Sequence, residues 1–466
     1  MFAVLNFIQQ VLSTPAIFVG LLALLGLLLQ KTDAQTCIKG TIKTILGFIV
    51  LNSGADVVQA AIIPFGELFQ IAFGVEGVVP NNEAITSLGL SEFAVQTASI
   101  FALGMVFNII LARFSKLKYI FLTGHHALYM SCLVAILMSI AGLEGVQLIV
   151  TGAMLMGLVM GIFPALMQPT IEEITGDDSL ALGHFGSGCY WLSAQIGKLF
   201  GKDDDTTTTE DINFPKTLSF LRENTVSIAL AMFLCYIVVA GVANFTAAEA
   251  AAEIFAGDNW VLYSVIKSIT FSAGIYVVLA GVRMLINEIV PAFKGISEKL
   301  VPNAKPALDC PIVFPFAPNA VLIGFFCSFV GGILAMLVLA LMGNAGLAVA
   351  IILPGAVLHF FCGATAGVCG NARGGLKGCI AGSFVHGIVA TFLAAGLYPV
   401  LGSMGFANTT FSDTDFTLVG IIFGNLCKVV SPTVLTVIVV ILFLIPIAYN
   451  YTIGKSTSAP VNQDEQ

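Results

Sequence analysis

The sequence predicts an all-α polytopic membrane protein with about 11 transmembrane helices, made of two inverted five-helix repeats with two re-entrant hairpins and a final helix. The first observation behind this prediction is composition. Of the 466 residues, 58% are hydrophobic and only 10% are charged, whereas about a quarter of the residues in a soluble domain are charged. The other two observations are an alternation of basic and acidic loops and a set of motifs that recurs along the chain.

Composition and motifs also exclude several classes of protein. The net charge of -8 argues against nucleic acid as a partner. The ten cysteines stand singly, without a C-x-x-C pair or the spacing of metal ligands. No G-x-x-x-x-G-K-[ST] motif occurs. We therefore predict no metal, no cofactor, no catalytic residue and no P-loop ATP hydrolysis, so that a gradient or another protein must supply the energy for transport.

The predicted spans follow from hydrophobic length, since a bilayer core requires about 20 apolar residues per helix. The first thirty residues carry no charge, so the basic region of a cleavable signal peptide is missing and we expect the first span to be retained. The predicted spans are 14–30, 44–73, 93–112, 119–143, 146–169, 226–245, 260–282, 320–342, 346–370, 379–402 and 429–451.

Basic residues predict the orientation of these spans. Nothing basic precedes the first span, whereas Lys31, Lys39 and Lys43 follow it. The positive-inside rule then places the N-terminus outside and, after eleven spans, the C-terminus inside. Basic residues recur in every second loop and the intervening loops carry acidic charge, with Lys267 and Lys428 as the exceptions.

Two halves of the chain resemble each other. Residues 47–54 (GFIVLNSG) are similar to residues 274–281 (GIYVVLAG) at an offset of 227, and shorter motifs follow in the same order at offsets of 222 to 231. Because each unit contains five spans, an odd number, the second copy enters the membrane with opposite polarity, as in many secondary transporters. We expect a first repeat at 1–225 with a long cytoplasmic loop at 171–225, an inverted repeat at 226–402, and a final span with a cytoplasmic tail at 403–466.

In inverted-repeat folds the substrate site lies near the bilayer midplane, where interrupted hydrophobic segments meet. The second and seventh spans are interrupted by a charge at matching positions, Asp56 and Arg283. A stretch rich in Pro and Asn follows each of them, at 78–84 and 301–320. We interpret these stretches as re-entrant hairpins from opposite faces, and ordinary surface loops are the alternative.

Ionisable groups at membrane depth are costly and mark candidate functional sites. His125 and His126 lie in the fourth span, Asn82 and Asp309 lie in the two predicted hairpins, and His184 lies in the long loop.

Two other polar features receive a structural interpretation. His359 and His386, within spans nine and ten, are interpreted as residues that hydrogen-bond between helices. The acidic and threonine-rich run 203–210 is interpreted as a solvated linker.

Several short motifs resemble the ascorbate-type IIC permeases of the bacterial phosphotransferase system. They are residues 38–44 (IKGTIKT), 122–125 (LTGH), 168–170 (QPT) with 182–184 (LGH), and 316–320 (FAPNA). The similarity runs from about residue 10 to residue 450 in the order of the family.

This resemblance implies a multi-pass protein of the bacterial cytoplasmic (inner) membrane. It further implies a homodimer that carries a small sugar or sugar acid across the membrane by an elevator-type movement. A separate, phosphorylated cytoplasmic IIB protein would phosphorylate the substrate as it is released. The chain is then a transport component and not an enzyme by itself.

The resemblance also implies binding residues. The family's binding histidines and acidic ligand correspond to His125, His184 and Asp309. Three positions depart from the pattern of the ascorbate permease, with aromatic rings in place of two amides and an amide in place of a hydroxyl, so the substrate is expected to be L-ascorbate or another sugar or sugar acid. The candidate substrate-binding residues are His125, His184, Asp309, Asn82, Tyr129 and Phe185.

Two alternative functions share part of this pattern. A gradient-driven secondary transporter of a small organic anion or polyol would have the same inverted repeat and midplane site. An integral membrane enzyme acting on lipid is disfavoured, because such an enzyme has no reason to be duplicated with inverted polarity. A neighbouring gene for a small protein with a phosphorylatable Cys near its N-terminus would favour the phosphotransferase system.

Cysteine labelling tests the predicted topology. A Thr206→Cys variant should not react with a membrane-impermeant thiol reagent in intact cells, because the loop that contains it is predicted to be cytoplasmic. It should react once the cells are opened. Strong labelling of intact cells, above the background of the native cysteines, would contradict the topology.

Overall fold

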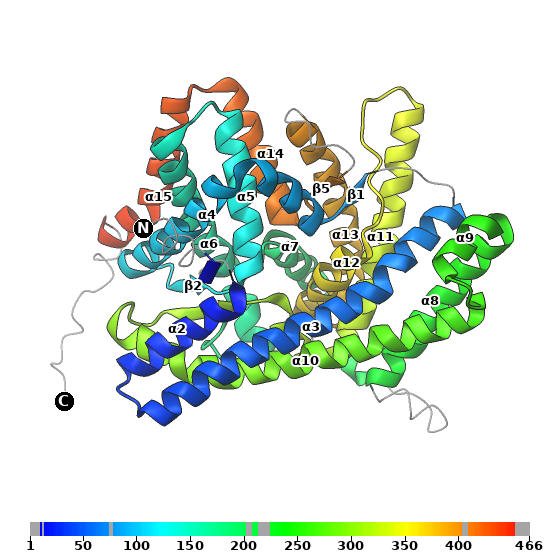
Figure 1. The fold of residues 1–466 in the computed structure, drawn as a ribbon, viewed down its shortest axis with the longest axis horizontal. Helices are drawn as coiled ribbons and strands as arrows, with labels where there is room; N and C mark the ends of the chain where they lie inside the picture. Colours follow the sequence, from blue (N-terminus) through cyan, green and yellow to red (C-terminus); the bar gives the residue numbers. More distant parts are fainter. Residues whose placement is uncertain are drawn as a thin grey trace.

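The computed structural model describes residues 10–11, 14–73, 78–201, 207–212, 224–402 and 409–452, and most of them are helical (Figure 1). The helices in chain order are α2 (Pro15–Leu29), α3 (Ala34–Phe73), α4 (Asn82–Phe114), α5 (Gly124–Ile140), α6 (Gly145–Thr175), α7 (Ser187–Lys198), η1 (Thr209–Asp211), α8 (Asn224–Thr246), α9 (Ala248–Phe255), α10 (Trp260–Lys299), η3 (Cys310–Phe316), α11 (Pro318–Asn344), α12 (Ala356–Leu358), η4 (His359–Gly363), α13 (Ala364–Gly402), α14 (Thr414–Val429) and α15 (Pro432–Thr452).

Five short strands lie between these helices, and all of their pairings are parallel. One sheet has the order β2-β4-β3, and β1 pairs with β5. Val78, next to β1, also forms a parallel bridge with Ile352. The strands are β1 (Val79–Pro80), β2 (Tyr119–Phe121), β3 (Ala181–Leu182), β4 (Lys305–Leu308) and β5 (Thr409–Thr410).

Five helices among the described residues are long and apolar enough to cross a membrane. This agrees with an all-α membrane protein, while the number of eleven spans stays a prediction. The five are Val95–Phe114, Gly145–Thr175, Pro318–Gly343, His359–Gly402 and Pro432–Asn450.

The helices α3 and α10 form the longest layer of the molecule. Each has 40 residues, and they lie side by side along one edge of the ribbon, with α2, α8 and α9 beside them (Figure 1). At 1.5 Å per residue each helix is about 60 Å long, twice the thickness of a bilayer core. The predicted interruption of the second span at Asp56 is not a break in the helix. The Asp56 side chain is exposed, and α3 continues through Asp56 and Pro64.

The remaining helices form a bundle on the other side of this layer. Within it, α13 contains a sharp break at Gly374 and Gly375, where Gly375 has a φ of 57°. Gly370 and Gly378 pack against each other across the break, since a Cβ on Gly370 would lie 2.3 Å from the Gly378 carbonyl oxygen. The chain thus folds back on itself between the predicted spans nine and ten.

The segment that we predicted as a long loop, 171–225, is partly ordered structure. It contains the end of α6, strand β3 and helix α7, whose small residues pack against α13. Apolar residues such as Tyr190 and Ala194 on α7 are fully buried, which explains why this segment folds. Residues 202–206 and 213–223, including the labelling position Thr206, lie outside the described residues.

Part of the acidic run is bound to the bundle and is not a solvated linker. Thr209 is fully buried, and its N–H donates to Asn371 Oδ1 at 3.0 Å. Glu210 Oε1 accepts from the backbone N–H groups of Asn319 and Ala320, in the first turn of α11, at 2.9 and 3.3 Å. Helix N-termini have free N–H groups and a partial positive charge, so a carboxylate from a remote segment stabilises the start of α11.

Replacing Glu210 tests this contact. Glu210→Ala should destabilise the detergent-purified protein by about 1 kcal/mol, the usual cost of removing a helix cap. Glu210→Gln keeps an acceptor oxygen and should cost less. Exposed Glu253, within α9, provides the control variant Glu253→Ala. Equal thermal unfolding midpoints for Glu210→Ala and Glu253→Ala would contradict the role of Glu210.

Candidate functional site

Polar side chains gather where the five short strands lead into helices. Each strand is followed within five residues by the start of a helix, and a polar residue stands at or near each junction. Because the strands within each group are parallel, their carboxyl ends lie at the same edge, and the N–H groups of the following helices gather there. The junction residues are Asn82 after β1, His125 and His126 after β2, His184 after β3, Asp309 after β4 and Asp413 after β5.

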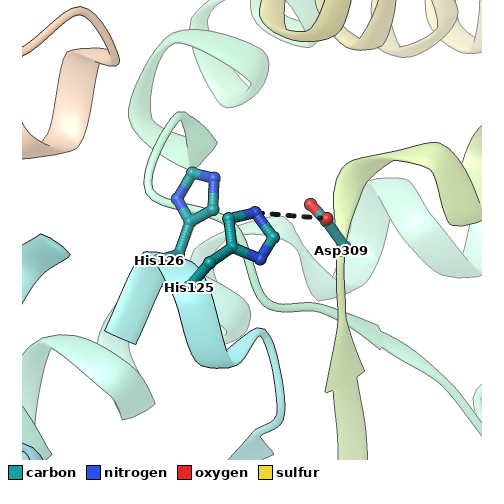
Figure 2. A group of neighbouring side chains, drawn as sticks. All are labelled: His125, His126 and Asp309. Atoms are coloured by element: carbon teal, nitrogen blue, oxygen red, sulfur yellow. Dashed lines mark ion pairs between the residues drawn. The ribbon is translucent and has the colours of Figure 1, made fainter. Parts of the chain in front are cut away.

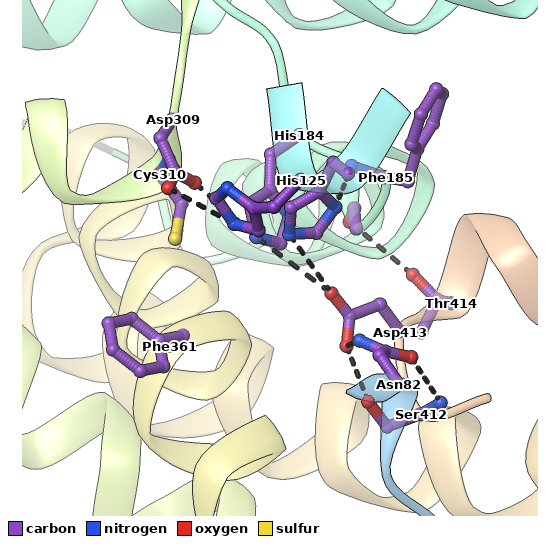
Figure 3. A network of polar contacts seen from close by, with 12 residues as sticks. Asn82, His125, His184, Phe185, Asp309, Cys310, Phe361, Ser412, Asp413 and Thr414 are labelled. Carbon is purple, nitrogen blue, oxygen red and sulfur yellow. Dashed lines mark hydrogen bonds and ion pairs between the residues drawn. The ribbon is translucent and has the colours of Figure 1, made fainter. Parts of the chain in front are cut away.

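Three histidines and two aspartates form the centre of the site. Asp309 lies 3.6 Å from His125 Nε2 (Figure 2). It also lies 3.7 Å from His184 Nε2. Asp413 Oδ2 lies 3.7 Å from His126 Nε2 and 3.8 Å from His184 Nε2 (Figure 3). These distances exceed those of hydrogen bonds, so each nitrogen and oxygen keeps its capacity to bond a hydroxyl group of a ligand.

Hydrogen bonds to Nδ1 determine which ring nitrogen of each buried histidine faces the carboxylates. The Phe185 N–H donates to His126 Nδ1 at 3.5 Å, so a neutral His126 carries its proton on Nε2 and offers a donor towards Asp413. The Tyr190 hydroxyl lies 2.9 Å from His184 Nδ1, which leaves Nε2 directed at the two carboxylates. Burial lowers the pKa of His184, against the opposing effect of Asp309 and Asp413.

The two carboxylates are held differently. Asp309 is the N-cap of η3, and its Oδ1 accepts from the Cys310 N–H at 2.7 Å. Asp413 precedes α14, and its Oδ1 accepts from Asn82 Nδ2 at 2.9 Å and from Ser412 Oγ at 2.6 Å. The Asp413 side chain is only 6% exposed, whereas Asp309 is 16% exposed. Asp413 therefore belongs to the buried part of the site, and Asp309 to its more open part.

The same atoms could in principle hold a metal ion. Ligand atoms of His126, His184 and Asp413 lie within 4.8 Å of one another. However, the hydrogen bond from Phe185 places the His126 proton on Nε2, the atom that a metal would need. The donor set therefore fits a ligand that hydrogen-bonds better than it fits a metal ion.

Comparison with known proteins identifies the family. Residues 10–415 match the family described as the sugar-specific permease component of the phosphotransferase system (PTS). The chain belongs to this family. A curated relative, the ascorbate-specific PTS system EIIC component of Mycoplasma pneumoniae (strain ATCC 29342 / M129 / Subtype 1), is 27% identical over 425 residues. The match covers 80% of this chain and 63% of the relative, so the permease spans less than two thirds of that relative's length.

The family that the short motifs predicted is thereby confirmed, and the chain is a transport component. The structure brings His125, His184 and Asp309 together, although they lie in three separate segments. Asn82 contacts this group indirectly, because its Nδ2 donates to Asp413 and Asp413 lies beside His184.

The two aromatic candidates lie in different surroundings. Phe185 is fully buried, and its ring stacks on Phe121 with 4.7 Å between the ring centroids. Phe185 meets the site at His126, through its N–H bonded to Nδ1 and through the edge of the aromatic cluster, with 6.2 Å between the two ring centroids. Tyr129 is half-buried, 5.9 Å from the His125 ring between centroids. Of the two aromatics, only Tyr129 lies directly beside a candidate binding side chain on the open part of the site.

Sequence reasoning missed Asp413 and Tyr190. The alternation of basic and acidic loops predicts an outer loop for Asp413, because no basic residue lies beside it. The residues Ser412 to Asp415, placed directly before an apolar helix, are typical of a helix N-terminus and could have indicated an ordered junction. Tyr190 could not have been found, because its contact with His184 depends on how α7 turns after β3.

The prediction that His359 and His386 hydrogen-bond between helices is confirmed. Ser328 Oγ lies 2.8 Å from His359 Nδ1 and 2.9 Å from His386 Nδ1, so one hydroxyl joins three helical segments.

Substitution by glutamine should separate the two aromatic residues. Phe185→Gln places an amide in an aromatic cluster and should destabilise the permease by roughly 3 to 5 kcal/mol. Tyr129→Gln should fold normally and change the order in which ascorbate and other sugar acids compete for uptake. Thermal unfolding and competition assays measure the two effects. Normal stability of Phe185→Gln, with an altered substrate order, would show that its ring lines the site.

Proposed function

We propose that this permease binds and translocates a sugar or sugar acid, with L-ascorbate as the first candidate, and that a separate cytoplasmic IIB protein phosphorylates the substrate. The observation that carries the proposal is the convergence of His125, His184 and Asp309 at strand-to-helix junctions. These are the residues that the motif resemblance assigns to the binding site. The ascorbate-specific relative supports the substrate.

The chemistry of the site suits such a ligand. Ascorbate is a monoanion at neutral pH and carries several hydroxyl groups. The helices α4, α5, α7 and α14 all begin at the site, and each N-terminus contributes a partial positive charge of about half a unit. Neutral histidines can donate to ring oxygens, and the aspartates can accept from hydroxyl groups.

The two halves of the chain support a two-fold arrangement around this site. Strand β4 lies between β2 and β3, and β1 pairs with β5 and is bridged to Ile352 at Val78. Along the sequence, β1 corresponds to β4 at an offset of 226, β3 to β5 at 228, and the end of β2 to Ile352 at 231. The helices α3 and α10 correspond at an offset of 226. We infer inverted repeats, in which the bundle moves against the α3 and α10 layer in an elevator-type motion.

The remaining features of the proposal follow from the family resemblance and the charge pattern. We propose a homodimer in the bacterial inner membrane, with eleven spans, the N-terminus outside and the C-terminus inside. The main alternative is a gradient-driven secondary transporter, which would release its substrate unmodified.

Uptake with and without the IIB partner distinguishes these functions. Cells without their own ascorbate uptake should accumulate labelled ascorbate phosphate only when this chain and its IIB partner are both present. Accumulation of unmodified ascorbate without IIB, abolished by an ionophore, would favour the gradient-driven transporter.

A variant of the site supplies the second part of the test. Asp309→Asn should reduce uptake tenfold or more, since a hydrogen bond to a charged group contributes about 1.5 to 3 kcal/mol. Asp258→Asn is the matched control, because Asp258 is exposed and lies outside the site. Near-normal uptake by Asp309→Asn would assign Asp309 a structural role.

A further inference from the structure

Asp413 shares the histidines of the substrate site. Both Asp309 and Asp413 lie within 3.8 Å of His184 Nε2, and Asp413 also approaches His126. In Figure 3 the histidines lie between the two carboxylates, which come from different segments of the chain. Among the described residues, the ion-pair partners of both carboxylates are histidines. The two aspartates are therefore parts of one cluster.

The two oxygens of Asp413 have different surroundings. Oδ1 accepts hydrogen bonds from Asn82 Nδ2 and Ser412 Oγ, which fix the carboxylate. Oδ2 faces His126 and His184 at distances too long for hydrogen bonds. A buried carboxylate is costly unless it is well bonded. A ligand hydroxyl that donates to Oδ2 would reduce that cost, which favours a binding role for this oxygen.

Asn82 is fully engaged with the β5–α14 junction. Its Nδ2 donates to Asp413, and its Oδ1 accepts from the Ser412 N–H at 2.9 Å. Asn82 thus holds the Asp413 side chain through its amide nitrogen and the neighbouring Ser412 backbone through its amide oxygen. At the equivalent position of the second half, 227 residues later, stands Asp309, which faces the histidines directly.

We propose that Asp413 is a second substrate-binding carboxylate of the permease and that Asn82 is its positioning residue. The inference rests on the proposed function and adds to it a second binding carboxylate and the residue that positions it. A ligand held between Asp309 and Asp413 must present hydroxyl donors in two directions. A polyhydroxylated sugar or sugar acid meets this requirement, and a simple carboxylate such as acetate or succinate does not.

Uptake kinetics of four variants test the proposal, with labelled ascorbate and IIB present. Asp413→Asn should raise KM at least tenfold, because the amide removes the charge and places a donor group beside the histidine donors. Asn82→Ala should raise KM by a smaller factor. In the double variant Asn82→Ala/Asp413→Asn, KM should equal that of Asp413→Asn alone, because Asn82 acts through Asp413.

Asp415→Asn is the matched control. Asp415 is as buried as Asp413 and lies two residues away, but its Oδ1 accepts from the Gly188 N–H and it faces α7. Burial raises the pKa of Asp415, and asparagine keeps the size of this side chain and an acceptor oxygen for the Gly188 N–H. Its KM should stay within twofold of the wild-type value. Thermal unfolding of each variant separates loss of binding from loss of fold.

The possible results of these uptake measurements test the binding role of Asp413, the positioning role of Asn82 and the proposed substrate separately. Normal KM for a folded Asp413→Asn, with normal wild-type uptake, overturns the inference and leaves the proposed function standing. Additive effects of Asn82→Ala and Asp413→Asn make Asn82 an independent contributor and overturn its positioning role. If Asp413→Asn does not fold, Asp413→Glu replaces it, and an unchanged KM for that variant overturns the inference. Absence of wild-type uptake contradicts the proposed substrate and the inference together.

Discussion

The structure depends on the cost of placing backbone polar groups in an apolar interior. Two short sets of parallel strands satisfy their own N–H and C=O groups inside the bundle, and each strand then leads into a helix. The free N–H groups of those helix starts need partners or an anionic neighbour. Asp309 meets this requirement at the start of η3, where its Oδ1 accepts from the Cys310 N–H. Asp413 stands at the N-cap position of α14, but its side chain bonds Asn82 and Ser412 instead of the helix. The same junctions carry the histidines. The geometry of the site thus follows from the need of buried backbone N–H and C=O groups for hydrogen-bond partners.

Close packing at glycine holds the junctions in register. Gly183 lies beside β4, and a Cβ at this position would be 2.5 Å from the Ala307 carbonyl oxygen. Only glycine allows β3 to approach β4 so closely, and its N–H donates to Leu308 at 2.6 Å. His184 follows directly and is thereby held against Asp309. The close approach of two backbones at Gly183 therefore decides where the imidazole of the next residue lies.

The separation into a layer and a bundle suits transport. The α3 and α10 helices pack along each other, and the site lies in the bundle beside them (Figure 1). Both carboxylates and all three clustered histidines belong to the bundle, so the candidate site is complete without a residue of the α3 and α10 layer. The Glu210 contact links the start of α11 to the segment after α7, which ties separate parts of the bundle into one body.

The sequence by itself determined the membrane class, the PTS permease family and three central site residues, because composition and short motifs such as LTGH and LGH are local properties. It also indicated the break between spans nine and ten. Only the tertiary structure decided that Asp413 joins the site, that the Phe185 ring packs in an aromatic cluster and that Glu210 caps α11. Each of these depends on contacts between segments more than 50 residues apart, where the hydrophobic pattern of one segment carries no information about the polar groups of its neighbour.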